Sequence, residues 1–134
     1  MAALPEAVIA QHGQVNLLIN NAGITYQKSF ANHSIEDWET ITGVNYWGVV
    51  YGCHYFLPAL RDAGEAHIVN LSSMNALVGL PSQSSYCATK AAAKIITAVQ
   101  RGRMRVRVGP DAVLVDILKR CFPVGLHRLL ARAG

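Results

Sequence analysis

The chain has 134 residues, with 12 Lys and Arg against 8 Asp and Glu and a formal net charge of +4. With 51% hydrophobic and 15% charged residues, its composition excludes the hydrophilic, highly charged class of disordered chains. A single domain of this length buries about two thirds of the surface that its unfolded form exposes, so a hydrophobic core is expected.

The charge is unevenly distributed along the chain. Residues 1–100 carry a net −2, whereas residues 101–134 carry a net +6 and include arginine at every second position of 101–107. A basic stripe of this kind can contact nucleic-acid phosphates, but no aromatic residue alternates with the arginines to stack on bases. We therefore expect a solvated face and no nucleic-acid partner.

The sequence shows no sign of membrane insertion, secretion or metal binding. The most apolar window, 43–60, is interrupted by Asn45 and His54, and residues 1–13 lack the basic start of a signal peptide. The three cysteines form no C-x-x-C pair, and the five histidines have no ligand spacing. We expect a cytoplasmic chain with no membrane span, no disulfide and no metal.

The first half of the chain predicts a helix, a strand and a second helix. Apolar residues at helical spacing favour a helix over 2–12 that ends at Gly13. The apolar run 15–20 fits a buried parallel strand that opens into a loop. Ser34, followed by acidic residues, is typical of a helix start, and this long helix should run to about residue 60 with a kink or break at Pro58.

The second half predicts a strand at 67–71 and an alanine-rich helix over 86–100. Beyond it, the alternating arginines of 101–108 predict a half-buried strand, and apolar residues at 113–118 and 126–131 predict two further helices. Strands that alternate with helices favour an α/β fold with a parallel sheet.

Tyr86 and Lys90 are four residues apart, which places both side chains on one face of the predicted helix. A phenol titrates at about 10 in water, so it is a weak acid or base catalyst at neutral pH unless a neighbouring cation favours its phenolate. Lys90 supplies such a cation. A Y-x-x-x-K pair also occurs by chance, so the surrounding residues decide its interpretation.

Polar and small residues follow both strands of the predicted sheet. Ser73, which precedes Tyr86 by 13 residues, lies two residues beyond the second strand, where its hydroxyl could bond a substrate carbonyl beside the phenol. Asn20 ends the first strand and Ala22 and Gly23 follow it, and the small residues would let a flat ligand approach the backbone. Because the carboxyl ends of parallel strands meet at one edge, both groups should share one crevice.

In these motifs the sequence resembles the short-chain dehydrogenase/reductase family. The resemblance is carried by NNAG at 20–23, VNYWG with Asn45, HIVNLSS ending at Ser73, and YCATK at 86–90. Their order and separations are similar to the family's pattern over residues 1–93.

The resemblance implies an oxidoreductase that transfers a hydride between NAD(P) and a small-molecule secondary alcohol or ketone. Tyr86 would be the general acid or base, and Ser73 would position and polarise the reacting oxygen. Lys90 would favour the tyrosinate and bind the nicotinamide ribose, while Asn45 would hold a water that links Lys90 to solvent. This division is sensible, since the cofactor carries the redox chemistry and the protein supplies a tuned proton donor.

The same resemblance implies that Asn20, Ala22, Gly23, Tyr86 and Lys90 contact the nicotinamide cofactor. The family's glycine-rich turn TGxxxGxG, which binds the cofactor diphosphate at a helix N-terminus, is absent from the sequence. The residues that select the cofactor are absent as well, so the choice between NAD and NADP stays open.

The implied fold is a single incomplete domain over 1–134, a partial Rossmann-like, doubly wound parallel sheet lacking its first three strands. Residues 1–93 would form the catalytic segment, and 94–134 resembles the C-terminal end of larger family members, joined through an internal deletion. In the family's strand order, the strand at 15–20 would lie at an exposed sheet edge, which favours pairing with another chain. We therefore expect self-association.

Two alternatives stay open. The chain could be a catalytically inactive remnant of the family that does not bind cofactor and acts, if at all, through partner contacts. Affinity for NAD(P) separates this alternative from an active oxidoreductase. The other alternative is a basic nucleic-acid-binding protein, which a steep salt dependence of binding would reveal.

Overall fold

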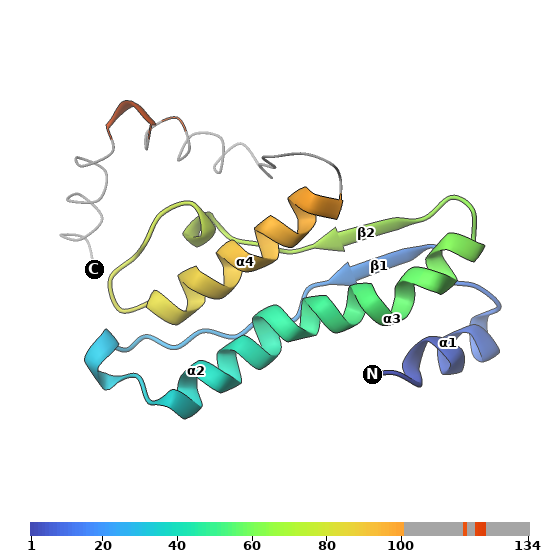
Figure 1. Ribbon diagram of the computed structural model, residues 1–134, viewed down its shortest axis with the longest axis horizontal. Helices are drawn as coiled ribbons and strands as arrows, with labels where there is room; N and C mark the ends of the chain where they lie inside the picture. The colour runs from blue at the N-terminus through green and yellow to red at the C-terminus, as the bar shows by residue number, and fades with distance from the viewer. Residues whose placement is uncertain (101–116, 118–119, 123–134) are drawn as a thin grey trace.

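The computed structural model describes residues 1–100, 117 and 120–122. Helices and strands alternate along residues 1–100 (Figure 1), which confirms the predicted α/β class. In chain order, the elements are α1 (Leu4–His12), β1 (Leu17–Asn20), α2 (Ile35–Thr42), α3 (Gly48–Asp62), β2 (His67–Asn70) and α4 (Ser84–Gln100).

Local signals set the helix ends much as predicted. α1 ends before Gly13, whose φ of +83° is a conformation that favours glycine. α2 begins with a capping box, in which the Ser34 hydroxyl accepts a hydrogen bond from the Asp37 N–H and the Asp37 carboxylate accepts one from the Ser34 N–H. α4 begins at Ser84 rather than Tyr86.

The long helix predicted from Ser34 does not break at Pro58. α3 continues through this proline to its end at Asp62. Phe56 and Leu60, on either side of the proline, are buried, and their packing offsets the roughly 3 kcal/mol that proline costs inside a helix. A break at Pro58 is therefore wrong for this chain.

The interruption lies earlier, in a π-helical turn at Gly43–Trp47 that joins α2 to α3. Single π-helical turns inside longer helices often occur at functional sites. Asn45 lies at the centre of this turn and is fully buried. The turn therefore determines which way the side chain of Asn45, a predicted site residue, points.

β1 and β2 pair in parallel, as their apolar runs predict. Leu17 lies opposite His67, and Asn20 lies opposite Asn70, so both strands end at the same edge of the sheet. The predicted strands are slightly longer than the observed ones. Parallel pairing brings the loops after both strands to one end of the sheet, as the site prediction requires.

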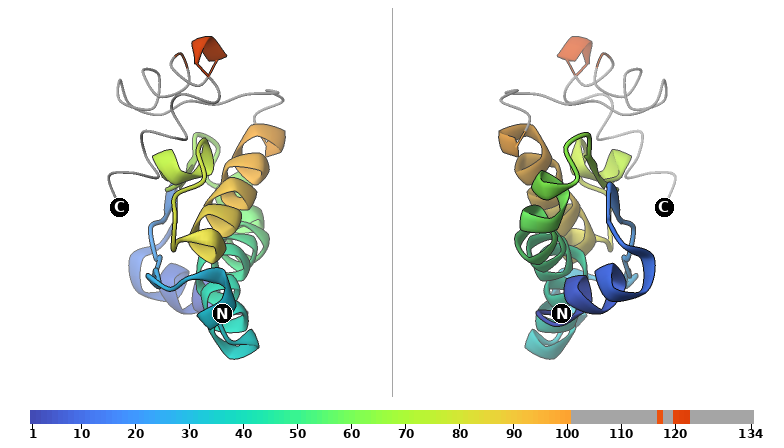
Figure 2. Two further views of the ribbon diagram at one scale, coloured as in Figure 1. Left: turned by 90° about the vertical axis from the view of Figure 1, so that its left-hand side faces the viewer. Right: turned by 90° about the vertical axis from the view of Figure 1, so that its right-hand side faces the viewer.

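α3 and α4 cover the same face of the two strands (Figure 2). Val49 and Cys53 of α3 pack with Ala93 of α4, and Ile68 of β2 contacts this cluster. Burying a valine or isoleucine side chain contributes about 1.5–3 kcal/mol each. This core holds α4, with its tyrosine and lysine, against β2.

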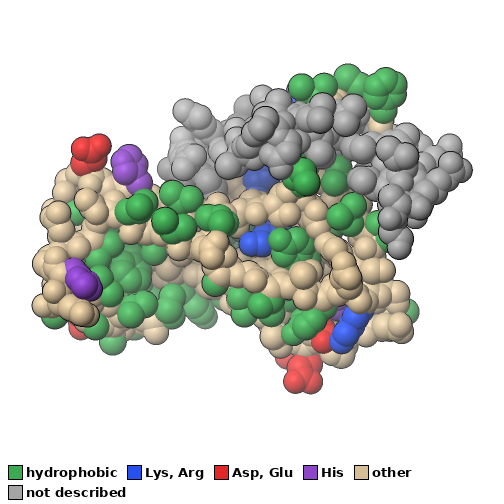
Figure 3. Space-filling view, turned by 180° about the vertical axis from the view of Figure 1, so that it is seen from behind, with side chains coloured by type: hydrophobic (Ala, Val, Ile, Leu, Met, Phe, Trp, Pro, Cys, Tyr) green, Lys and Arg blue, Asp and Glu red, His purple; other side chains and the backbone are tan. Residues whose placement is uncertain are grey.

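The other face of the sheet is open within the described residues. Leu17 and Ile19 are 51% and 54% exposed, and Val69 is 38% exposed. Figure 3, viewed from behind, shows hydrophobic side chains spread over this side of the molecule. An apolar face of a parallel sheet is normally covered by another element or another chain.

The strand predicted at 101–108 and the helices predicted at 113–118 and 126–131 lie outside the described residues, apart from Ile117. Among the residues that the structure describes, no helix combines the length and apolar character needed to cross a membrane. The same residues contain no group of three or more His, Cys, Asp or Glu side chains that could hold a metal ion.

Candidate functional site

The ends of β1 and β2 are tied together by two asparagines. Asn20 Nδ2 donates a hydrogen bond of 2.7 Å to Asn70 Oδ1 and lies 3.5 Å from Cys53 Sγ. Gly52 of α3 leaves the room that this contact needs, because a Cβ there would collide with Asn20 Oδ1. The Asn20 side chain thus stabilises the ends of both strands.

The loop after β1 passes directly over Lys90. A Cβ at Gly23 would lie 2.9 Å from Lys90 Nζ and 3.5 Å from Asn45 Oδ1. Ala22 and Gly23 are exposed, whereas Asn45 and Lys90 are buried, so the loop backbone covers both polar side chains. The structure therefore brings together three predicted site residues, Gly23, Asn45 and Lys90, that are distant in the sequence.

α4 presents Tyr86 and Lys90 one turn apart, as predicted. Lys90 Nζ lies 5.8 Å from the centroid of the Tyr86 ring and donates a hydrogen bond of 3.1 Å to the Leu71 carbonyl. Only 5% of Lys90 is exposed, and this burial lowers the pKa of its ammonium group below the ordinary lysine value. Tyr86 is partly exposed, so the pair joins a buried cation to a phenol that a ligand can reach.

The Asn45 side chain connects three segments. Its Nδ2 donates to the Ile24 carbonyl at 2.9 Å and to Thr89 Oγ1 at 3.1 Å, and its Oδ1 accepts from the Ile24 N–H at 2.9 Å. Both amide protons are therefore used. Within the described residues, Asn45 bonds to Thr89 and not to Lys90, so a water relay would need its second oxygen lone pair or its backbone.

Ser73 precedes a 3₁₀ turn, Met74–Ala76, that packs against α4. Its Oγ accepts a hydrogen bond of 3.2 Å from the Asn75 N–H. Because the hydroxyl is the acceptor in this bond, its proton stays available for a ligand oxygen. Ser73 and Tyr86 are both partly exposed, and no hydrogen bond joins their hydroxyls in the described part of the chain.

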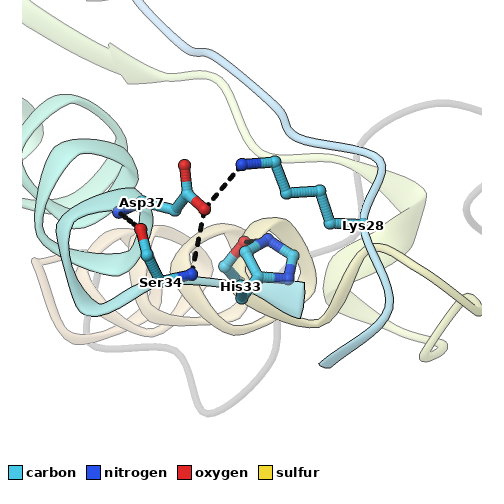
Figure 4. A network of polar contacts seen from close by, with 5 residues as sticks. Lys28, His33, Ser34 and Asp37 are labelled. Atoms are coloured by element: carbon cyan, nitrogen blue, oxygen red, sulfur yellow. Dashed lines mark hydrogen bonds and ion pairs between the residues drawn. The ribbon is translucent and has the colours of Figure 1, made fainter. Parts of the chain in front are cut away.

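The loop between β1 and α2 is anchored to both α2 and α4. Lys28 Nζ lies 2.7 Å from Asp37 Oδ2, and the same oxygen accepts from the Ser34 N–H at 3.0 Å (Figure 4). These contacts, chiefly the hydrogen bond from Lys28, lower the pKa of Asp37. His33 Nε2 lies 3.1 Å from Ser85 Oγ, which fixes the loop to the start of α4.

Two hydroxyls that hold these side chains in place are not predicted by the sequence patterns. Thr89 accepts from Asn45, and its own proton can reach the Tyr86 carbonyl at 3.1 Å or a second α4 carbonyl at 3.0 Å. Ser72 donates to the Lys90 carbonyl at 2.8 Å. In the sequence, only their positions point to them, because Thr89 precedes Lys90 and Ser72 precedes the predicted catalytic Ser73. Which group a hydroxyl bonds to depends on the tertiary structure.

The chain is similar in sequence to proteins of one known family. A family model described as short chain dehydrogenase matches residues 1–114. The putative oxidoreductase SadH of Mycobacterium tuberculosis is 41% identical over 127 residues, which cover 95% of this chain and 44% of that protein. D-threitol dehydrogenase of Mycolicibacterium smegmatis is 30% identical over 141 residues, covering 92% of this chain and 54% of that protein. The chain thus spans about half the length of these relatives.

Solved structures share the fold of a large part of this chain. A short-chain dehydrogenase/reductase from Burkholderia phymatum in complex with NAD is 36% identical with a TM-score of 0.67, and the match covers 75% of this chain and 35% of that one. The aldohexose dehydrogenase of Thermoplasma acidophilum is 27% identical with a TM-score of 0.71, over 74% of this chain and 39% of that one. About three quarters of this chain therefore has the fold of these proteins.

Proposed function

This chain belongs to the short-chain dehydrogenase/reductase family, and on that basis we propose that it is the catalytic part of an NAD(P)-dependent oxidoreductase that interconverts a secondary alcohol and a ketone. Its sheet and helices are accordingly part of a Rossmann-like fold. One observation carries the proposal, namely that Gly23, Asn45 and Lys90 meet next to Tyr86. The alternative is an inactive chain that binds no cofactor.

The residues present fit the nicotinamide end of the cofactor. Gly23 has no side chain where the loop crosses Lys90, and Lys90 Nζ has two protons beyond the one that it donates to a backbone carbonyl. In the proposal, Asn20, Ala22 and Gly23 contact the nicotinamide, and Lys90 and Tyr86 bind its ribose. When bound, NAD or NADP would supply or accept the hydride.

In the proposed reaction, Tyr86 gives a proton to the ketone oxygen during reduction and removes it from the alcohol during oxidation. Ser73 donates a second hydrogen bond to the same oxygen, using the proton that Asn75 leaves available. The buried Lys90 ammonium stabilises the tyrosinate, because charges interact more strongly where water is excluded. Asn45 keeps the loop and α4 together around this group.

Titration of the full chain with NADH and with NADPH, followed by cofactor fluorescence, tests the proposal. We expect saturable binding that Lys90→Met weakens. In a screen of secondary alcohols, Tyr86→Phe should lower NAD(P) reduction about 10²- to 10⁴-fold. Tyr51→Phe makes the same change at an exposed tyrosine of α3 and should affect neither readout. Folded chain that binds neither cofactor would support the inactive alternative.

We also propose that the chain self-associates through the uncovered face and the free edges of its sheet, as far as the described residues form it. The exposed apolar residues Leu17, Ile19 and Val69 lie on the two strands, and within the described residues each strand pairs on one side only. Light scattering of the purified chain should give a mass above 14.5 kDa that Ile19→Lys reduces. A clean monomer at all concentrations would contradict this part of the proposal.

A further inference from the structure

Leu71 and Ser72, the two residues after β2, bond to the side chain and to the main chain of Lys90. The Leu71 carbonyl accepts a hydrogen bond of 3.1 Å from Lys90 Nζ, and Ser72 Oγ donates one of 2.8 Å to the Lys90 carbonyl. Lys90 is buried, so water competes little for either bond. The loop therefore fixes both the ammonium group and the main chain of one residue.

α4 does not need the Ser72 bond for its own stability. Inside a helix, a carbonyl already accepts from the N–H four residues later, and its second lone pair is available to a side chain. Lys90 lies in the interior of Ser84–Gln100, and Ser72 uses a lone pair of this kind. Because the bond adds nothing to the helix ladder, its effect is to set the position of α4 relative to the end of β2.

We propose that Ser72 is a positioning residue, which fixes Ser73 relative to Tyr86 and Lys90. Ser73 is the next residue along the chain, and Tyr86 lies one helical turn before Lys90. The hydrogen bond thus links the neighbour of the proposed oxygen-binding serine to the helix that carries the proposed acid.

The role assigned to Ser72 rests on the proposed function, in which Ser73 and Tyr86 act on the same oxygen. A misplacement of about 1 Å between such groups can lower a rate about 10²-fold. Ser72 itself does not touch the reacting atoms in this scheme, because its hydroxyl proton is already given to Lys90.

Chemical labelling tests the contact without requiring activity. Ser72→Ala is compared with Ser84→Ala, a matched control because Ser84 Oγ is buried and lacks a partner among the described residues. Each full chain is checked by circular dichroism and acetylated with acetic anhydride. The rate at Lys90 is then read by mass spectrometry against Lys28, whose side chain is 43% exposed.

We expect Ser72→Ala to speed acetylation of Lys90 about two- to tenfold, the factor by which one lost hydrogen bond changes a local opening equilibrium. Ser84→Ala and Ser72→Thr, which keeps the hydroxyl, should retain the wild-type rate. An unchanged rate in folded Ser72→Ala overturns the proposal. If that variant does not fold, Ser72→Cys, which keeps a weak donor, replaces it.

Steady-state kinetics with NAD(P) and secondary alcohols test the catalytic consequence. The kcat of Ser72→Ala should fall about 10- to 100-fold while KM for the cofactor changes less, because orientation rather than binding is lost. Rescue by Ser72→Thr is expected, and a normal kcat in Ser72→Ala overturns the positioning role. Wild-type chain that binds no cofactor would instead overturn the proposed function, and labelling would still decide whether Ser72 holds Lys90.

Discussion

The Asn45 carboxamide donates a hydrogen bond of 3.1 Å to the Thr89 hydroxyl, and this contact joins the π-helical turn to α4. Both residues are buried, with 0% and 5% of their surfaces exposed. The same carboxamide binds the N–H and the carbonyl of Ile24. One side chain therefore connects the loop after β1 to the helix that carries Tyr86 and Lys90.

Thr89→Val tests this connection at nearly constant volume. The variant leaves a buried N–H of Asn45 without its acceptor, so we expect the free energy of unfolding to fall by about 1–3 kcal/mol. Thr89→Ser keeps the hydroxyl and should lose less. Urea unfolding of both variants measures the difference, and equal midpoints for Thr89→Val and wild type would show that the bond contributes nothing.

Gly52 of α3 is predicted to tolerate no side chain. Replacing glycine with alanine inside a helix normally stabilises it by about 0.5–1 kcal/mol. At position 52, however, the new Cβ collides with Asn20 Oδ1 and should break the bond between Asn20 and Asn70. We therefore expect Gly52→Ala to destabilise the fold by about 1–3 kcal/mol.

Gly48→Ala is the matched control for that substitution. It lies in the same helix, and the atom nearest to its added Cβ is the Gly43 carbonyl oxygen at 3.9 Å. The control should therefore be neutral or stabilising in thermal unfolding. If both alanine variants shift the melting temperature equally, the contact between α3 and Asn20 does not explain Gly52.

Features that are set by a few neighbouring residues could be predicted from the sequence. The end of α1 at Gly13 and the start of α2 at Ser34 follow from a glycine and a capping box, which act locally. The passage of α3 through Pro58 could not be predicted, because the buried Phe56 and Leu60 outweigh the local preference.

In the candidate site as well, some features could be predicted from the sequence and others could not. Family motifs point to Asn45 and Lys90 as individual residues, but not to the contacts that hold them. Ser72 bonds to a residue 18 positions away, and Thr89 bonds to one 44 positions away. A hydroxyl accepts many partners, so its choice becomes visible only when the helices and strands are packed together.

Burial of Lys90 predicts a stability that changes with pH. Its pKa is lowered in the folded chain, so between that value and the unfolded value of 10.5 the unfolded chain binds more protons. The free energy of unfolding then rises with pH in this window. Below the window the cost of burying the ammonium is constant, and above it the cost has disappeared.

Lys90→Met removes this titration and leaves all other groups in place. Wild type should therefore gain stability relative to Lys90→Met as the pH rises toward 10.5. Urea unfolding of both chains at several pH values measures the difference. A difference that does not vary with pH would mean that Lys90 titrates normally in the folded chain.

The start of α2 should weaken in acid, because Asp37 has a lowered pKa in the folded chain. A lowered carboxyl pKa stabilises the fold above the unfolded value of 3.8, and this contribution is lost as the pH falls through the folded value. Asp37→Asn keeps an acceptor for the Ser34 N–H but removes the charge. The advantage of wild type over Asp37→Asn should therefore be present above pH 3.8 and should shrink as the pH falls below that value.

Lys28→Met separates the ion pair from the helix cap. The hydrogen bond from Lys28 is the largest cause of the lowered pKa of Asp37, so most of the pH-dependent advantage should vanish in the Lys28→Met background. High salt should reduce it as well, because Lys28 is partly exposed and the pair is screened. If the advantage of Asp37 survives in Lys28→Met, the Ser34 N–H and the α2 dipole hold the carboxylate without help from the lysine.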